Sequence, residues 1–274
     1  MMGTAPHILL KAALEWHLEA GADEALVDGP VDRTAAPDLP RKPDLPEITA
    51  ASADLPGAAA ARREAVTRAQ ACQTLEELKQ AIQDFDGLAI KKTATQIVFA
   101  DGNPKAHVML VGEAPGGDED RLGRPFVGVS GQLLDRILKC VGLDRTGESP
   151  ENALYISNIL NWRPPGNRTP TPAEIEIALP FIERHIALVA PKVLIFCGGV
   201  SAKALLGRSE GISRLRGQLH DYHPRTDGIG GGLAPIPALA TYHPAYLLRT
   251  PAQKKAVWAD MLMLQRHIRD TALS

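Results

Sequence analysis

The chain has 274 residues, of which 45% are hydrophobic and 23% charged, enough for one large folded domain or for a domain with a tail. No apolar run approaches the roughly 20 residues of a membrane helix, and no secretory signal pattern is present, so we expect neither a membrane-spanning nor a secreted protein. The net charge is only −2, but residues 1–159 carry −8 and residues 160–274 carry +6, which is typical of a phosphate-binding face in the second part, with ordinary solvated charge as the alternative.

Residues 7–27 carry apolar side chains at helical spacing and predict one amphipathic helix. Residues 28–60 are rich in Pro, Ala and Asp, which is typical of a flexible linker. A helical pattern then runs over residues 61–85. We therefore expect a tail over residues 1–60 and one folded domain over residues 61–274.

Short apolar runs alternate with helical patterns through the rest of the chain. The runs predict β-strands over residues 106–112, 154–158, 192–197 and 236–241. The helical patterns cover residues 132–141, 172–189, 200–206 and 252–269. This alternation predicts an α/β fold, a three-layer α/β/α sandwich around a central four-stranded parallel sheet. Ligands bind such sheets at the carboxyl ends of the strands, which here are residues 112–120, 158–168, 198–201 and 241–249.

The three cysteines do not form a recognisable framework. Cys72, Cys140 and Cys197 are odd in number and far apart, and they match no zinc-binding spacing. We expect free thiols in a reducing cytoplasm, with no metal site and no other cofactor.

The most unusual stretch follows the first strand, where residues 112–135 read GEAPGGDEDRLGRPFVGVSGQLLD. Gly116 and Gly117 let the backbone approach a ligand, while the four acidic residues beside this turn argue against a phosphate cradle. A solvated loop is the alternative for these acids. Phe126 favours a binding site, because a flat ring in a Gly- and Pro-rich loop can stack on a nucleobase.

Polar side chains follow two further strands. Asn158 ends the second strand, and its amide can donate and accept at a base edge, with an Asx turn as the alternative. Arg163 and Arg168 lie on the next loop and suit phosphates, as does the basic stretch over residues 212–220. His243 directly follows the fourth strand, where a His can donate to an oxyanion that develops on a ligand.

These segments, in this order, resemble the uracil-DNA glycosylase superfamily, and its family 4 most of all. Residues 112–135 follow the motif GEAPG…ED…G.PFVG.AGQLLD almost letter for letter, residues 158–174 are similar to N..KCRPPGNR.PTP.E, and His243–Pro244 matches the terminal HP motif. The resemblance covers about residues 85–270. It implies a monofunctional glycosylase of base excision repair, which flips uracil out of DNA and hydrolyses the N-glycosidic bond.

The resemblance also implies partners and a location. The partner is uracil-containing DNA, the product is free uracil, and no membrane is involved. We expect a monomer in the bacterial cytoplasm that associates with the nucleoid when it acts.

Four positions depart from the family pattern. Family 4 enzymes hold an iron–sulfur cluster through four cysteines, and the aligned residues here are Phe85, Leu88, Trp162 and Ala178. Because such a cluster is bound by thiolates, we expect none, and we expect these side chains to fill its space by packing. The loop after Asn158 also lacks the nucleophilic His of DNA-crosslinking relatives, which predicts turnover and no covalent trap.

The resemblance assigns roles to the residues of the uracil pocket. Uracil would stack on Phe126 and pair with Asn158 through O4 and N3–H, an order of acceptor and donor that cytosine reverses. His243 would stabilise the charge that develops on O2. The expected DNA-binding residues are Ser130, Gly131, Arg163, Arg168, Arg216, Gly217 and Arg249.

The catalytic carboxylate stays open at this point. Ala114 stands where the best-known glycosylases have an Asp, so Glu113 and Glu119 are the candidates. Gly116 stands where other families have a Tyr, and we favour Glu119 as the pocket wall against the thymine methyl group, with Glu113 structural or assisting. Ala114, Gly116 and Gly117 complete the expected uracil-binding set.

Three other functions remain as alternatives. The same pocket fits a glycosylase for deaminated purines such as xanthine or hypoxanthine. The missing Asp motivates a non-catalytic or product-retaining reader of damaged or single-stranded DNA. A nucleoside hydrolase that acts on free deoxyuridine is the third.

Overall fold

The computed structural model describes residues 56–230 and 234–271 of the chain. The predicted helix over residues 7–27 and most of the predicted linker lie outside the described residues. Helix α2 (Pro56–Ala71) begins ahead of the predicted start of the domain. The reason is local: Pro is favoured in the first turn of a helix, and the alanines that follow are strong helix formers.

The helical pattern predicted as one run is two helices, α2 and α3 (Leu75–Asp84). Thr74 separates them, because its hydroxyl accepts a hydrogen bond of 3.1 Å from the Glu77 N–H. The Glu77 carboxylate in turn accepts from the Thr74 N–H at 3.3 Å. This reciprocal cap begins a new helix and ends the continuous pattern.

The sheet has six strands in the order β1-β3-β2-β4-β6-β5. The strands are β1 (Asp101–Gly102), β2 (Val108–Gly112), β3 (Leu154–Asn158), β4 (Val193–Cys197), β5 (Leu219–Tyr222) and β6 (Ile236–Thr241). The four predicted strands are present and mutually parallel. The predicted strand count was too low, because β1 and β5 add antiparallel pairs at the two edges. β1 has two residues and β5 is only partly buried, so neither leaves an apolar run in the sequence.

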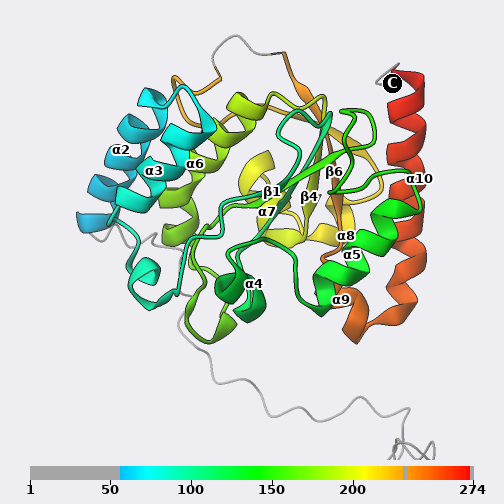
Figure 1. Cartoon of the computed structure of the whole chain (residues 1–274), viewed down its shortest axis with the longest axis horizontal. Helices are drawn as coiled ribbons and strands as arrows, with labels where there is room; N and C mark the ends of the chain where they lie inside the picture. Colours follow the sequence, from blue (N-terminus) through cyan, green and yellow to red (C-terminus); the bar gives the residue numbers. More distant parts are fainter. Residues whose placement is uncertain (1–55, 231–233, 272–274) are drawn as a thin grey trace, which may run out of the picture. The chain divides into compact units, whose positions relative to one another are not determined.

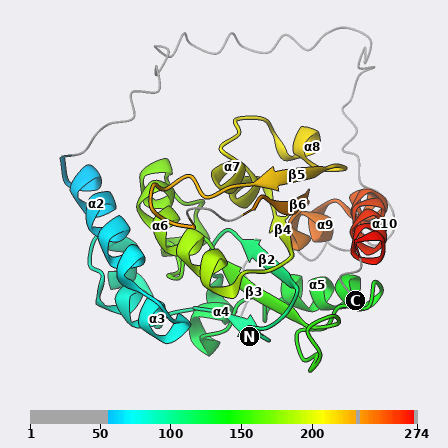
Figure 2. The same cartoon turned by 90° about the horizontal axis from the view of Figure 1, so that it is seen from above.

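Helices cover both faces of the sheet, which confirms the three-layer prediction. Figure 2 shows α2, α3, α6 (Pro172–Val189) and α7 (Gly199–Leu206) on one side, and α5 (Val129–Lys139), α9 (Pro244–Arg249) and α10 (Lys254–Asp270) on the other. Strand β2 serves both cores: Met109 and Val111 pack on the α6 side, whereas Val108 and Leu110 pack on the α10 side. Burial of both faces explains why the strand reads as a continuous apolar run.

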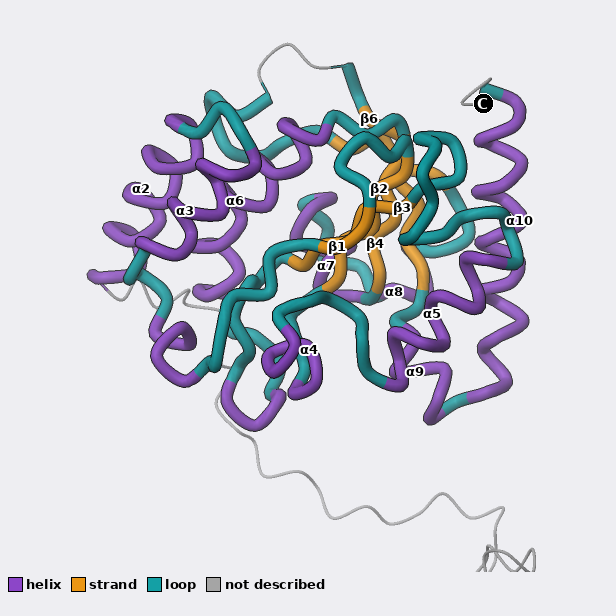
Figure 3. The backbone as a smooth tube through the Cα atoms, viewed as in Figure 1, coloured by secondary structure: helices purple, strands orange, loops and turns teal. Residues whose placement is uncertain are grey.

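The remaining short helices are α4 (Gly117–Leu122), α8 (Ile212–Leu215), η1 (Ala89–Thr93), η2 (Pro165–Asn167) and η3 (Pro251–Gln253). In Figure 1 and Figure 3, α4 and α9, which follow β2 and β6, both lie below the sheet. This edge is where the carboxyl ends of the parallel strands meet. None of the helices in the described part of the chain is long and apolar enough to cross a membrane.

Candidate active site

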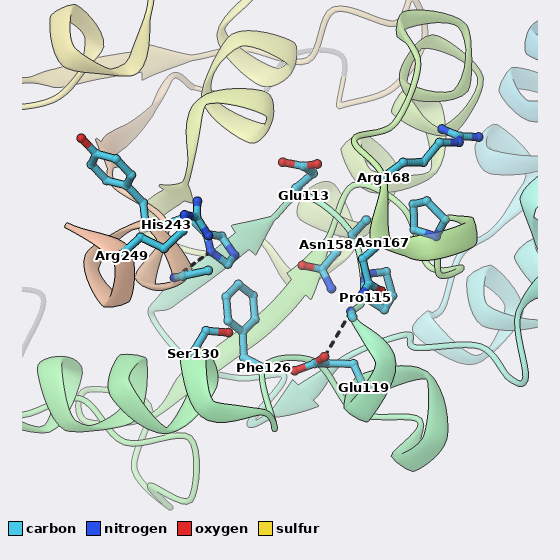
Figure 4. A pocket seen from close by; sticks show the side chains of 15 residues that line it. Glu113, Pro115, Glu119, Phe126, Ser130, Asn158, Asn167, Arg168, His243 and Arg249 are labelled. Carbon is cyan, nitrogen blue, oxygen red and sulfur yellow. Dashed lines mark hydrogen bonds between the residues drawn. The ribbon is translucent and has the colours of Figure 1, made fainter. Parts of the chain in front are cut away.

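A cavity of about 500 Å³ opens at the carboxyl edge of the parallel strands (Figure 4). The residues predicted from the sequence that line it are Glu113, Ala114, Gly116, Glu119, Phe126, Ser130, Asn158, Arg168, His243 and Arg249. The lining residues that were not predicted from the sequence are Pro115, Pro164, Asn167, Ala245 and Tyr246. Segments far apart in the chain therefore build one site.

Asn158 presents an unsatisfied acceptor to this site. The residue ends β3 and is only 2% exposed. Its amide oxygen Oδ1 is buried and has no hydrogen-bond partner in the described part of the protein. Since buried polar atoms are nearly always hydrogen-bonded, this oxygen is suited to a donor on a bound ligand.

The ring of Phe126 lies between Asn158 and His243 (Figure 4). Its backbone has a φ of 53°, in the left-handed region that side chains rarely adopt. Arg145 holds it there, because the guanidinium donates to the Phe126 carbonyl at 2.9 Å and pairs with Asp135 at 2.7 Å. Gly131 packs beneath: a Cβ on it would lie 1.9 Å from the Phe126 oxygen. Gly131 does not line the cavity, and its DNA contact stays a prediction beside this packing role.

The Glu119 carboxylate is committed to the backbone of the same loop. It accepts hydrogen bonds from the N–H groups of Val127 at 2.9 Å, Gly128 at 3.0 Å and Gly116 at 3.1 Å. These three bonds occupy both oxygens of the carboxylate. The geometry favours Glu119 as a wall that shapes the pocket.

Glu113 is the carboxylate that remains available. It lines the cavity, and its side chain makes no hydrogen bond or ion pair with any described residue. Burial raises the pKa of this carboxyl above its ordinary value. A buried carboxylate with a raised pKa is a better base than an exposed one.

His243 is a neutral hydrogen-bond donor in this site. Burial, with a smaller contribution from Arg249, lowers its pKa to about 4. The Ala245 N–H donates to Nδ1 at 3.2 Å, which leaves the ring proton on Nε2. Its ring centre lies 5.4 Å from that of Phe126.

A buried acid supports the strand that leads to His243. Asp260 on α10 accepts from the Thr241 hydroxyl at 2.7 Å and pairs with Arg216 at 2.7 Å. Arg216 is thereby paired inside the fold and does not line the cavity, and its role in DNA binding stays a prediction. Gly217 is exposed and does not line the cavity, and its DNA contact stays a prediction as well.

The other arginines predicted to bind DNA differ in whether their side chains already have hydrogen-bond or ion-pair partners. Arg249 lines the cavity and makes no hydrogen bond or ion pair with the described residues. Arg168 also lines it, but its guanidinium points away from the centre (Figure 4) and binds Glu174 at 2.6 and 2.8 Å. Arg163 lies outside the lining and donates to Asn167 at 2.7 Å. A Cβ on Gly117 would lie 3.4 Å from the Arg163 guanidinium, and Gly117 does not line the cavity, so its contact with uracil stays a prediction.

The four positions aligned with cluster cysteines lie in one hydrophobic core. Phe85, Leu88, Trp162 and Ala178 are each at most 7% exposed and belong to the same cluster of buried side chains. The Lys91 ammonium group lies 6.0 Å from the centre of the Trp162 ring. These carbon side chains do not fit an iron–sulfur cluster, which needs thiolate ligands. Within residues 56–230 and 234–271, no group of three or more His, Cys, Asp or Glu could hold a metal ion.

Comparison with known proteins agrees with this architecture. A family model described as "Uracil DNA glycosylase superfamily" matches residues 99–262, more than half of the chain. The chain belongs to the uracil DNA glycosylase superfamily. The matched range contains every strand of the sheet and all residues that line the cavity.

Curated relatives narrow the position of the chain within the superfamily. It is 37% identical over 193 residues to the type-4 uracil-DNA glycosylase of Pyrobaculum aerophilum, which covers 69% of this chain and 92% of the relative. It is 32% identical to the type-4 uracil-DNA glycosylase of Sulfurisphaera tokodaii, over 73% of this chain and 86% of the relative. It is also 32% identical to the type-4 uracil-DNA glycosylase of Archaeoglobus fulgidus, over 69% of this chain and 90% of the relative. The resemblance to family 4 is confirmed.

Proposed function

We propose that this protein is a uracil-DNA glycosylase that hydrolyses the N-glycosidic bond of uracil flipped out of DNA. The observation that carries the proposal is the unpaired amide oxygen of Asn158, which lines the same cavity as the Phe126 ring and the neutral His243. One acceptor, one aromatic face and one donor around a cavity of this size match the edge, face and O2 of a uracil.

Base recognition follows from the amide. With uracil stacked on Phe126, Asn158 Oδ1 accepts from N3–H and its NH₂ group donates to O4. Cytosine offers an acceptor at N3 and a donor at N4, so both bonds are lost and a buried polar atom stays unpaired. Such a site can reject the wrong partner by about 10⁴-fold. The loop held by Glu119 supplies the wall toward C5, where thymine carries its methyl group.

Bond cleavage uses His243 and Glu113. As the bond between C1′ and N1 breaks, its electron pair moves onto the uracil, and the His243 Nε2–H stabilises the charge at O2. Glu113 stabilises the cationic sugar and takes a proton from the water whose oxygen adds to C1′. The chain supplies all these groups itself, and no step uses a metal ion or an iron–sulfur cluster.

The strand is held at the rim of the cavity. Arg249 and Ser130 are placed to contact phosphates, and Arg168 joins them when it leaves Glu174. We further propose a monomer that releases free uracil, turns over without a covalent DNA adduct, and works on nucleoid DNA in the cytoplasm.

The test is uracil release from a uracil-containing oligonucleotide in the presence of a chelator. Wild type is compared with His243→Ala and Asn158→Ala, and Leu262→Ala, an exposed residue on α10, is the matched control. We expect each site variant to lose about 10²- to 10³-fold in rate and the control to keep wild-type activity. Parallel substrates carry xanthine, hypoxanthine or thymine in place of uracil.

Each other result points to a different function. A folded wild type that binds the oligonucleotide without releasing uracil is a non-catalytic reader. Release from free deoxyuridine but not from the oligonucleotide identifies a nucleoside hydrolase. Faster release of xanthine or hypoxanthine than of uracil assigns the pocket to deaminated purines.

A further inference from the structure

A second cavity, of about 420 Å³, lies between α5 and α10. Its apolar lining comes from Leu133, Ile137 and Val257. Trp258 lies at its edge and is 45% exposed, which is unusual for so large an apolar side chain. We call this feature the α5–α10 groove.

Two cations complete the lining, and nothing neutralises them. Arg136 and Lys254 both line the groove and are exposed, and neither side chain makes a hydrogen bond or an ion pair with a described residue. No carboxylate is among the residues that line the groove. An apolar surface that carries an exposed aromatic ring and two unpaired cations is complementary to a base with its phosphates.

The groove and the catalytic cavity are lined by consecutive parts of the same two segments of the chain. Ser130, in the first turn of α5, lines the catalytic cavity, and the later turns of the same helix supply Leu133 and Arg136 to the groove. On the other side, Arg249 ends α9 in the catalytic cavity, and the chain passes through η3 directly to Lys254. A strand bound at the first cavity is therefore led toward the second.

We propose that the α5–α10 groove holds a nucleotide that flanks the uracil on the same DNA strand. The inference rests on the proposed function. The base stacks on Trp258 above the apolar floor, and Arg136 and Lys254 bind the adjacent phosphates. Arg136 lies about 9 Å along α5 from Ser130, at about 1.5 Å per residue. At about 3.4 Å per nucleotide, the groove takes the second or third nucleotide from the uracil.

The kinetic test uses single-stranded oligonucleotides with one uracil and a flank that grows one nucleotide at a time, on either side. We expect wild-type kcat/KM to rise on one side when the flank reaches about three nucleotides. For Trp258→Ala we expect kcat/KM on the substrates with the long flank to be about ten-fold lower than for wild type. The rate of this variant on the shortest substrate should be unchanged. Arg136→Gln and Lys254→Gln should each lower the salt slope by about 0.7.

Matched controls lie on the same helix. Leu262 is 43% exposed, Lys255 is exposed, and neither lines the groove. Leu262→Ala and Lys255→Gln should therefore keep the wild-type dependence on flank length. Thermal melting of all variants shows whether any loss reflects unfolding.

Cys140 provides a second readout in the wild-type protein. It lines the groove and is exposed, whereas the other two cysteines are buried. We expect an oligonucleotide with an abasic site and a long flank to slow alkylation of Cys140, and one with the shortest flank to leave it unchanged. Buried Cys72 and Cys197 serve as internal references in the same digest.

The outcomes separate this inference from the proposed function. If uracil release is normal but does not depend on flank length, and Cys140 is not protected, the groove does not bind the DNA strand. The groove is then assigned to a protein partner. Absence of uracil release from every substrate overturns the proposed function. Flank-dependent protection of Cys140 in that case still supports strand binding at the groove.

Discussion

Asn158 and Gly112 are register partners at the ends of β3 and β2, and the amide oxygen of Asn158 lies where a side chain of Gly112 would be. A Cβ on Gly112 would come within 2.3 Å of Asn158 Oδ1 and 2.7 Å of the Phe126 ring. Gly112 does not line the cavity, yet its missing side chain lets the amide and the ring meet there.

Gly112→Ala should therefore displace Asn158 or Phe126 in the pocket, although the new methyl group would not contact the ligand itself. Because contacts below 3 Å force Asn158 or Phe126 to move, we expect a loss of about 100-fold in kcat/KM, as for a misplaced catalytic group. Gly211→Ala is the control, since a Cβ there meets nothing within 4 Å. Wild-type kinetics in Gly112→Ala would show that the pocket tolerates rearrangement of both groups.

The pH dependence of uracil release should identify the carboxylate. Burial raises the pKa of Glu113 above 4.5, so Glu113 is ionised above that pKa and becomes protonated as the pH falls through it. His243 has a pKa of about 4 and stays neutral until lower pH. We expect kcat/KM to fall first at the pKa of Glu113. Glu113→Gln should lose about 100-fold in rate and keep only the transition near pH 4.

Glu119→Gln is the contrasting variant. Its carboxylate accepts three backbone hydrogen bonds, and an amide has one oxygen to accept them. We expect a higher KM and a loss of about 2 kcal/mol in the free energy of unfolding, without a shift of the acid limb. Disappearance of the acid limb in Glu119→Gln, and not in Glu113→Gln, would reverse the two assignments.

Arg216 and Arg249 should respond to mutation in opposite ways. Arg216→Ala leaves the buried Asp260 without its cation, which should cost about 3 kcal/mol of unfolding free energy, measured in urea, with little change in the salt dependence of DNA binding. Arg249→Ala breaks no ion pair and should keep the stability within about 0.5 kcal/mol. It should instead lower the salt slope by about 0.7 for a single strand. Equal salt slopes for both variants would return Arg216 to the DNA interface.

The apolar core at the aligned cluster positions should contribute to stability. Trp162 is 7% exposed, belongs to the same buried cluster as Phe85 and directly precedes Arg163 in the chain. Trp162→Ala should lower the free energy of unfolding by about 3 to 5 kcal/mol through the space it leaves. Trp162→Phe keeps an aromatic ring, so it should lower the free energy of unfolding by a smaller amount. Unchanged urea midpoints for both variants would contradict the packing role.

Much of the site could be predicted from the sequence, because its residues follow strands of one parallel sheet. Asn158 and His243 lie within short segments whose strand-end position is visible in the apolar pattern, and Phe126 lies farther along the Gly- and Pro-rich loop after the first strand. Asp260 was missed, although a charged residue beside buried Val257 and Met261 on one helix was a usable signal. Arg145 left no signal, because its partners are 10 to 44 residues away along the chain.

The sequence by itself determined the class of fold, the four parallel strands and the family, since these depend on local periodicity and on contiguous motifs. Only the tertiary structure decided which charged side chains are paired inside the fold. Glu119 and Glu113 are near neighbours in sequence, but one carboxylate meets three N–H groups and the other meets none. Arg216 and Arg249 look alike as cations until Asp260 neutralises one of them. The chemical role of an ionisable group depends on the partners that folding brings to it, and these come from distant parts of the chain.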